Sequence, residues 1–240
     1  MSGRAGPRPF GAGLGMLLSA LLLARPAVPE PAPQPPVAAS LEGALAGLPG
    51  RNMGRGGRPG DPMNLLFLGN DASVRGALTE AGWTQVPLGI PGSVWGGLMD
   101  LLSGKRLTRF PPFNHYGLDG RDQSMNWAQT VRPLAERHHF RLWKLALRDA
   151  GGRTLWWGSG NYDVRIRWRD LSHVPDPDMN AEREHVRRSL EGSRWVAGFD
   201  LKRLPQVPTE GANDKGYPFR TDGHVLVVML RDVPGERHPK

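Results

Sequence analysis

The residues best suited to chemistry are gathered in the block Ser172–His185, which contains two histidines, four carboxylates and one arginine. In a helix that begins inside this block, Asp178, Glu182 and His185 stand at i, i+4 and i+7, so they share one side of the helix. Carboxylates and imidazoles in such a row can act as general acids and bases or as metal ligands. The block therefore marks a place where a site could form.

A second block, Arg137–Trp143, has two adjacent histidines flanked by arginines. Because side chains alternate between the two faces of a strand, His138 is predicted on the more apolar face. His139 is predicted on the more polar face, together with Arg137 and Arg141. Guanidinium groups suit phosphate and carboxylate oxygens, so the two arginines are candidate anion-binding residues. His138 is interpreted as a core imidazole whose hydrogen bonds are satisfied.

The first block also has a purely structural explanation, which we favour. Asp176 is expected to cap the helix, with Pro177 at its first position, and acidic residues in this turn complement the helix dipole. Arg183 lies close to the apolar stripe of the helix. It is therefore expected to turn inward and to form a structural ion pair with a carboxylate.

Catalysis is the alternative, and it makes a geometric demand. In a hydrolase, His139 and His173 would be the acid/base or ligand groups. Either Asp178 or Glu182 would be their carboxylate partner, so residues from separate elements must converge. No HxH or HExxH spacing indicates a metal, and no Walker, GxGxxG or GxSxG pattern indicates a nucleotide or a serine nucleophile. We therefore expect no metal and no cofactor.

Charge and composition exclude several classes of function. The 240-residue chain has a formal net charge of +8. Half of that charge comes from the first 60 residues, which hold six arginines and two acidic residues. The remaining charge is modest and no nucleic-acid motif accompanies it, so nucleic acid is not expected as a partner. The chain has no cysteine, which excludes disulfides, thiolate metal sites and a cysteine nucleophile.

The N-terminus resembles an export signal. Two arginines precede Phe10–Ala24, an uncharged apolar run that is shorter than the ~20 residues needed to span a bilayer comfortably. We interpret residues 1–24 as a signal peptide or an N-terminal membrane anchor, residues 25–60 as a Pro/Gly-rich linker, and residues 61–240 as the domain. The domain is then expected in the periplasm or at the outer face of the cytoplasmic membrane.

Hydrophobic patterning predicts an α+β fold, with a mainly antiparallel sheet and about three helices packed to one side. A continuous apolar run ending in glycine indicates a strand buried on both faces. A second apolar run, with strict alternation in its second arm, indicates a hairpin. The expected strands are Asn64–Gly69, Phe110–Gly120, His138–Arg148, Arg153–Trp168, Arg194–Leu204 and His224–Leu230, and the expected helices are Ala72–Ala81, Val94–Leu102 and Pro177–Glu191.

Four blocks of the chain, spread over roughly residues 62–230, are similar to the LssY C-terminal domain family. They are Asn64–Gly69 leading to Ala81-Gly82-Trp83, Arg137–Trp143, Leu155–Asp163, and His173 to Arg183. Val174 stands where the family has a second histidine, and Asn180 where it has an aspartate, which puts in doubt any mechanism that needs either group. The resemblance implies an envelope setting, because relatives are often joined to bacterial membrane proteins, including domains similar to type-2 phosphatidic-acid phosphatases. It implies no enzymatic activity.

Two functions follow from these observations. The favoured one is an exported accessory or binding module for an anionic envelope ligand, with anionic lipid or an envelope protein as the partner. The alternative is a hydrolase of the phosphoester type that uses the His/Asp/Glu cluster. The two differ in whether the blocks Arg137–Trp143 and Ser172–His185 share a cleft.

Overall fold

The structure is a computed structural model that describes residue 3 and residues 35–87, 115–132, 136–167 and 172–235. Residues Pro35–Lys240 form one compact unit, separate from Met1–Gln34. The expected signal or anchor and the expected helix Val94–Leu102 lie outside the described residues. Within the described part of the chain, no helix has both the length and the apolar character needed to cross a membrane.

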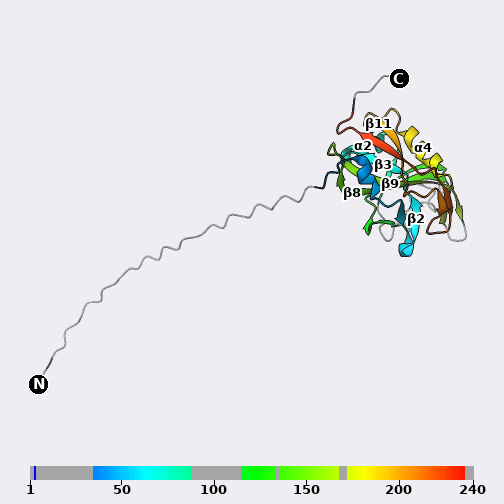
Figure 1. Cartoon of the computed structure of the whole chain (residues 1–240), viewed down its shortest axis with the longest axis horizontal. Coiled ribbons are helices and arrows are strands. Elements are labelled where there is room, and N and C mark those ends of the chain that lie inside the picture. The colour runs from blue at the N-terminus through cyan, green and yellow to red at the C-terminus, as the bar shows by residue number, and fades with distance from the viewer. Residues whose placement is uncertain (1–2, 4–34, 88–114, 133–135, 168–171, 236–240) are drawn as a thin grey trace. The chain divides into compact units, whose positions relative to one another are not determined.

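An eight-stranded sheet forms the centre of the unit (Figure 1). Its strands lie in the order β11-β14-β3-β9-β8-β7-β4, and β10 pairs with β9 outside this path. All pairs are antiparallel except β14 with β3, so the sheet is mixed. The bounds are β3 Leu65–Leu68, β4 Thr84–Val86, β7 Met125–Arg132, β8 Glu136–Arg148, β9 Thr154–Arg167, β10 Ser172–Pro175, β11 Val196–Arg203 and β14 His224–Leu230.

The central strand β3 is buried along its whole length, as its apolar run predicts. The hairpin β8–β9 is the longest feature of the sheet, and its turn follows Asp149, which accepts the backbone N–H of Arg153 through Oδ1 at 2.7 Å. Gly152 in this turn has a φ of 78°, a conformation that glycine adopts without strain. The pairing of β8 with β9 is irregular between Lys144 and Arg148. Beyond Lys144 it continues to the far end of the hairpin, where Arg137 lies opposite Asp163.

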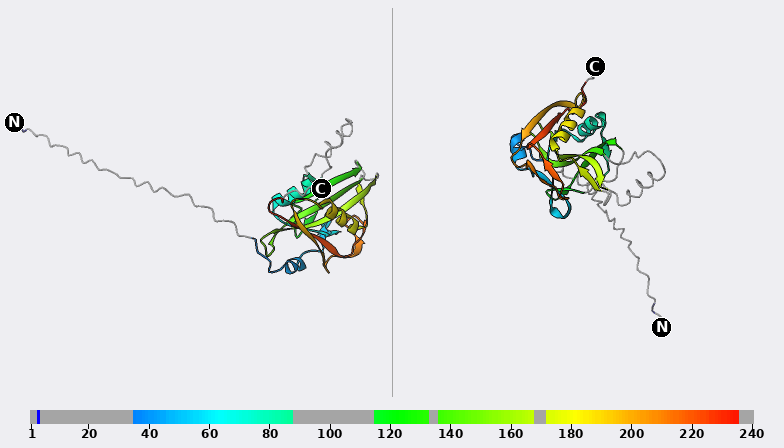
Figure 2. Two further views of the ribbon diagram at one scale, coloured as in Figure 1. Left: turned by 90° about the horizontal axis from the view of Figure 1, so that it is seen from above. Right: turned by 90° about the vertical axis from the view of Figure 1, so that its right-hand side faces the viewer.

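Two helices, α2 (Asp71–Glu80) and α4 (Met179–Ser189), cover one face of the sheet. Figure 2 shows them on the same side of the strands. The helix expected over Ala72–Ala81 begins one residue earlier, at Asp71, and Asn70 is its N-cap. The expected start of α4 is wrong. Its N-cap is Asp178, whose Oδ1 accepts from two backbone N–H groups, while Asp176 only accepts the N–H of Asp178.

The opposite face is covered by segments that include part of the expected linker. Helix α1 (Leu41–Ala46) buries Ala44 and Leu45 against the side of β3 that faces away from α2 and α4. The compact unit therefore begins before residue 61, and the helices do not all pack on one side. The other elements are β1 Arg51–Met53, the short 3-10 turn η1 Arg55–Gly57, β2 Pro59–Pro62, β5 Gly117–Leu118, β6 Arg121–Asp122, β12 Glu210–Ala212 and β13 Pro218–Arg220. The α+β class is confirmed.

Candidate functional site

The carboxylate of Asp163 is the centre of a compact group of ionisable side chains. Its Oδ2 accepts a hydrogen bond from Nε of Arg137 at 2.8 Å. The same oxygen lies 3.5 Å from Nδ1 of His139 and 3.5 Å from Nδ1 of His173. We call these four residues the Asp163 cluster. It unites His139 and His173, the two histidines named from the sequence as a candidate acid/base pair.

Three strands build the cluster. In the hairpin, Arg137 pairs directly with Asp163, and His139 pairs with Asn161. Side chains of paired residues point to the same face, so Arg137 and His139 both reach Asp163 from β8. His173 comes from β10, which pairs with β9 but changes register between Val174 and Pro175. The site thus draws its side chains from three strands of the sheet.

Burial controls the protonation states within the cluster. The side chains of Asp163 and His139 are 4% and 6% exposed, whereas those of Arg137 and His173 are 13% and 20% exposed. Burial lowers the pKa of His139 to about 3, because the positive charges nearby reinforce desolvation and Asp163 only partly offsets it. Burial and the charge of Arg137 also lower the pKa of His173. At neutral pH both imidazoles are uncharged.

Asp163 behaves in the opposite way. Burial acts to raise its pKa, but its interactions with His139, Arg137 and His173 outweigh burial and hold the pKa below its ordinary value. The cluster therefore contains a guanidinium, a carboxylate and two neutral imidazoles at pH 7. Such a set can bind an anion through its N–H donors or accept a proton at an imidazole nitrogen.

Arg141, the second candidate anion-binding residue, belongs to a buried network beneath the cluster. It is 6% exposed, and its guanidinium carbon lies 4.4 Å from the centre of the Tyr116 ring. Tyr116 donates its hydroxyl to Asp214 at 2.9 Å. Asn213 donates to Asp61 at 2.9 Å, and burial raises the pKa of this carboxyl group. Arg141 therefore holds buried segments together, whereas Arg137 lies nearer to solvent.

The turn between β12 and β13 adds a cation that sequence reasoning missed. Lys215 is exposed and forms no ion pair with any described residue. Its pKa is lowered by desolvation and by the charge of Arg141, while carboxylates including Asp163 act in the other direction. Its own charge contributes to the lowered pKa of His173. The ammonium group therefore lies near the surface of the Asp163 cluster.

The remaining candidates lie on the other face of the sheet. Glu182 accepts a hydrogen bond from Nδ1 of His138 at 2.5 Å, and His185 stacks on the same His138 ring. Asp178 is occupied as the N-cap of α4. Neither carboxylate joins His139, so the convergence that the hydrolase hypothesis needed from Asp178 or Glu182 is not formed. Asp163 is instead the carboxylate that lies beside His139 and His173.

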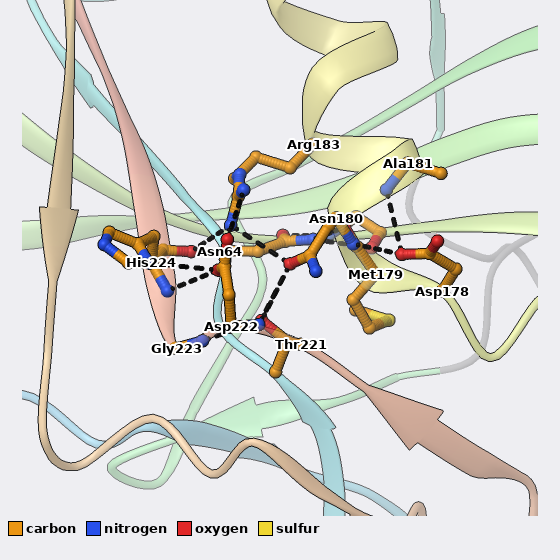
Figure 3. A network of polar contacts seen from close by, with 11 residues as sticks. Asn64, Asp178, Met179, Asn180, Ala181, Arg183, Thr221, Asp222, Gly223 and His224 are labelled. Atoms are coloured by element: carbon orange, nitrogen blue, oxygen red, sulfur yellow. Dashed lines mark hydrogen bonds and ion pairs between the residues drawn. The ribbon is translucent and has the colours of Figure 1, made fainter.

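Arg183 is found in an ion pair, shown in Figure 3. Its two terminal nitrogens bind both oxygens of Asp222 at 2.6 and 2.9 Å, and one of them also donates to the backbone carbonyl of His224 at 2.9 Å. Asn180 accepts from Thr221 at 3.2 Å and from the N–H of Asp222 at 3.1 Å. These contacts fasten α4 to the segment before β14, which is a structural role.

The described residues do not form a metal site. No group of three or more metal-binding side chains among them is placed to hold an ion. In the Asp163 cluster, the guanidinium of Arg137 already contacts the carboxylate oxygen and would repel a cation. Two cavities, of about 300 and 400 Å³, open elsewhere, and none of the four cluster residues lines either.

Comparison with known proteins gives one result. The family described as LssY C-terminus matches residues 45–225. This confirms the resemblance drawn from the four sequence blocks, and the match begins inside α1, before the domain boundary expected at residue 61. No curated protein and no solved structure matches the chain.

Proposed function

The chain belongs to the LssY C-terminus family, and we propose that its domain is a binding module for a ligand that carries a phosphate or carboxylate group. One observation carries the proposal. The side chains of Arg137 and His173 are 13% and 20% exposed and that of Lys215 is exposed, whereas the carboxylates of Asp163 and Asp61 are buried. An anion that approaches from solvent therefore meets cations and N–H donors before it meets a carboxylate.

The buried carboxylates position these donors. Asp163 fixes the guanidinium of Arg137 at 2.8 Å and lies beside the ring of His173. Donors that are held in place before binding lose less conformational entropy when the ligand arrives. The expected export of the chain would put this ligand in the cell envelope, either as a lipid headgroup or as a free phosphate compound.

The test uses the full chain at pH 7 and two kinds of ligand. Calorimetric titration with inorganic phosphate measures binding of the free anion. Co-sedimentation with phosphatidylglycerol vesicles, against phosphatidylcholine vesicles, measures binding to an anionic lipid. Arg137→Ala and Lys215→Ala should each weaken binding about tenfold or more, because a hydrogen bond to a charged group contributes about 1.5–3 kcal/mol.

Arg188→Ala is the matched control, since Arg188 is an exposed arginine on α4, across the sheet from the cluster. Equal affinity of wild type, Arg137→Ala and Lys215→Ala for both ligands would refute the proposal. Binding of phosphate without vesicle binding would identify a soluble ligand, and preferential vesicle binding would identify a lipid.

A second function is favoured by the contact between His173 and Asp163. A carboxylate beside one nitrogen of a neutral imidazole leaves the other nitrogen able to take a proton from water, as a phosphoester hydrolase requires. The test is a screen of phosphomonoesters and phosphodiesters, with and without a chelator. His173→Gln should abolish any activity found, whereas turnover that survives this change would exclude the residue from catalysis.

A further inference from the structure

On the face of β8 opposite the Asp163 cluster, two imidazole rings lie in direct contact. The rings of His138 and His185 are 3.5 Å apart and nearly parallel, at 8°. Tyr162 covers the other side of His138 at 4.4 Å. Glu182 accepts from His138 through one oxygen, and its second oxygen has no hydrogen-bond donor among the described residues. The buried carboxylate of Glu182 thus pairs with one of the two stacked imidazoles, that of His138.

Among the residues that the structure describes, none supplies a carboxylate that pairs with His185. On α4, Arg188 lies one turn further along and adds positive charge. From β7, the Gln129 side chain contacts Nε2 of His185 at 2.9 Å through its oxygen and is uncharged. From the segment before β4, Trp83 meets the edge of His185 and is also uncharged. The stack is therefore stable only while at least one ring is neutral.

The ion pairs near Tyr162 do not supply this countercharge either. Glu136 accepts from the hydroxyl of Tyr162 at 3.0 Å and is paired with Arg132 of β7. It therefore lies beyond Tyr162, on the far side of the His138 ring from His185. A proton added to His185 would face His138 with no carboxylate of its own.

Helix α4 carries this stack and also adjoins the Asp163 cluster. Strand β10, which bears His173, runs directly into α4 through Pro175–Asp178. Asp178 bridges to Arg220 of β13, and Lys215 lies in the turn that precedes this strand. A shift of α4 would therefore move His173 and Lys215 together.

We propose that the His138–His185 stack is a pH-sensitive latch that lowers anion binding at the Asp163 cluster when the environment becomes acidic. Protonation of the second imidazole separates the rings, loosens α4 from β8, and displaces His173 and Lys215. This inference rests on the proposed anion-binding function for its consequence. The latch itself rests on the geometry of the stack.

The direction and the pH window follow from His185. Burial and the charge of His138 lower its pKa in the folded protein to about 4. An unfolded histidine has a pKa of about 6.5, so the stack contributes its full stabilisation above that pH and loses it as the pH falls towards 4. Glu182 acts in the opposite sense, because burial raises its pKa in the folded protein, which therefore takes up this proton more readily than the unfolded chain.

The experiment measures the latch and its consequence separately. Hydrogen exchange of the α4 amides is followed from pH 7 to pH 4.5, with correction for the intrinsic pH dependence of exchange. Binding of dimethyl phosphate, whose charge is constant over this range, is measured in parallel. In the wild type, we expect protection of α4 to fall by about tenfold or more by pH 4.5, and affinity to begin to fall over the same range. His185→Phe keeps a flat ring but cannot take up the proton, so it should keep both the protection of α4 and the affinity for dimethyl phosphate as the pH falls.

His115→Phe is the control, because His115 is exposed and lies outside the stack. If His185→Phe does not fold, two measurements replace it: the same experiment on His185→Gln, and an NMR titration of the His185 ring in the wild type. A pKa near 6.5 for His185 in the wild type would overturn the latch. Identical loss of α4 protection in wild type and His185→Phe would also overturn it. Absence of dimethyl phosphate binding at pH 7 would instead count against the proposed function, whatever the exchange shows.

Discussion

Replacing Asp163 with asparagine tests whether one carboxylate holds the candidate site together. The change keeps the size and shape of the side chain and leaves an oxygen that can accept from Arg137. It removes the negative charge that Arg137, His139 and His173 share. Asp163→Asn therefore separates the contribution of charge from that of packing.

The magnitude follows from the burial of the group. Removing one partner from a fully buried ion pair costs about 3–5 kcal/mol, because the other charge is left uncompensated. Arg137 is 13% exposed, so it regains some hydration, and the amide oxygen keeps one hydrogen bond. We therefore expect a loss of about 2–3 kcal/mol in the free energy of unfolding. For a domain of this size, that corresponds to a fall in Tm of about 5–10 °C.

Urea denaturation at pH 7 measures this loss, with Asp119→Asn as the control at an exposed aspartate that pairs with no described residue. The effect should depend on pH. The pKa of Asp163 is held below its ordinary value in the folded protein, so its stabilisation is present above pH ~4 and disappears as the pH falls through the folded pKa. The difference between wild type and Asp163→Asn should therefore shrink in acid.

A second readout distinguishes charge from shape. Asp163 raises the pKa of both His139 and His173, so its loss should lower both pKa values further, as NMR titration of the rings would show. A change in stability below about 0.5 kcal/mol, which is ordinary for surface substitutions, or imidazole pKa values that rise, would refute the central role of this carboxylate.

Three further predictions concern the scaffold, and urea denaturation measures each. Arg183→Met should lower the free energy of unfolding by about 2–4 kcal/mol at pH 7, because Arg183 holds the pKa of Asp222 well below its usual range. This loss should vanish in strong acid, where Asp222 is protonated in both variants. A loss that does not change with pH would contradict the ion pair. Asn180→Asp should change the free energy of unfolding by less than about 1 kcal/mol, because Asn180 makes its hydrogen bonds through its side-chain oxygen, which aspartate keeps, and Arg183 lies beside it. A larger loss would mean that repulsion between the new carboxylate and Asp222 dominates. Gly158→Ala should lower the free energy of unfolding by about 1–3 kcal/mol, because the added Cβ would lie 2.7 Å from a methyl carbon of Leu142. An unchanged midpoint of urea denaturation would show that the core relaxes there without penalty.

Local patterning was enough to predict the elements that carry the site. The apolar run ending at Gly69 gave the buried strand β3, and strict alternation placed His138 and His139 on opposite faces of β8. The periodicity of α4 put Glu182 and His185 on one edge, where both meet His138. These predictions hold because each depends only on side-chain direction within a single element.

The role of Asp163 could not be predicted, because it depends on pairing between strands. Counting back along the hairpin from the pair Arg148 and Thr154 would put Arg165 opposite Arg137. The irregularity between Lys144 and Arg148 shifts the pairing by two residues, so Asp163 stands there instead. The sequence of the turn carries no signal for this shift, and β10, which brings His173, was too short to recognise.

The segment around residues 41–60 was misread for a related reason. Its glycine and proline content is typical of a linker, yet Leu45 and Asn52 are fully buried, and Asn52 accepts the backbone N–H of Asp61 at 3.0 Å. The gain from this packing comes from contacts with distant residues such as Leu66 and Trp157, which composition does not reveal.

These failures have a structural connection. The segments that were missed, β1, β2 and the β12–β13 turn, supply polar partners such as Asp61 and Lys215 to the face of the hairpin that holds Asp163. A buried ion pair usually contributes no more stability than well-packed apolar side chains of the same size, because both charges lose their hydration. Stability therefore does not account for a guanidinium, a carboxylate and two imidazoles at this place, with Arg141 and Asp61 beneath them. The anion-binding function proposed above would account for them, since the buried carboxylates would fix the N–H donors that such a site presents.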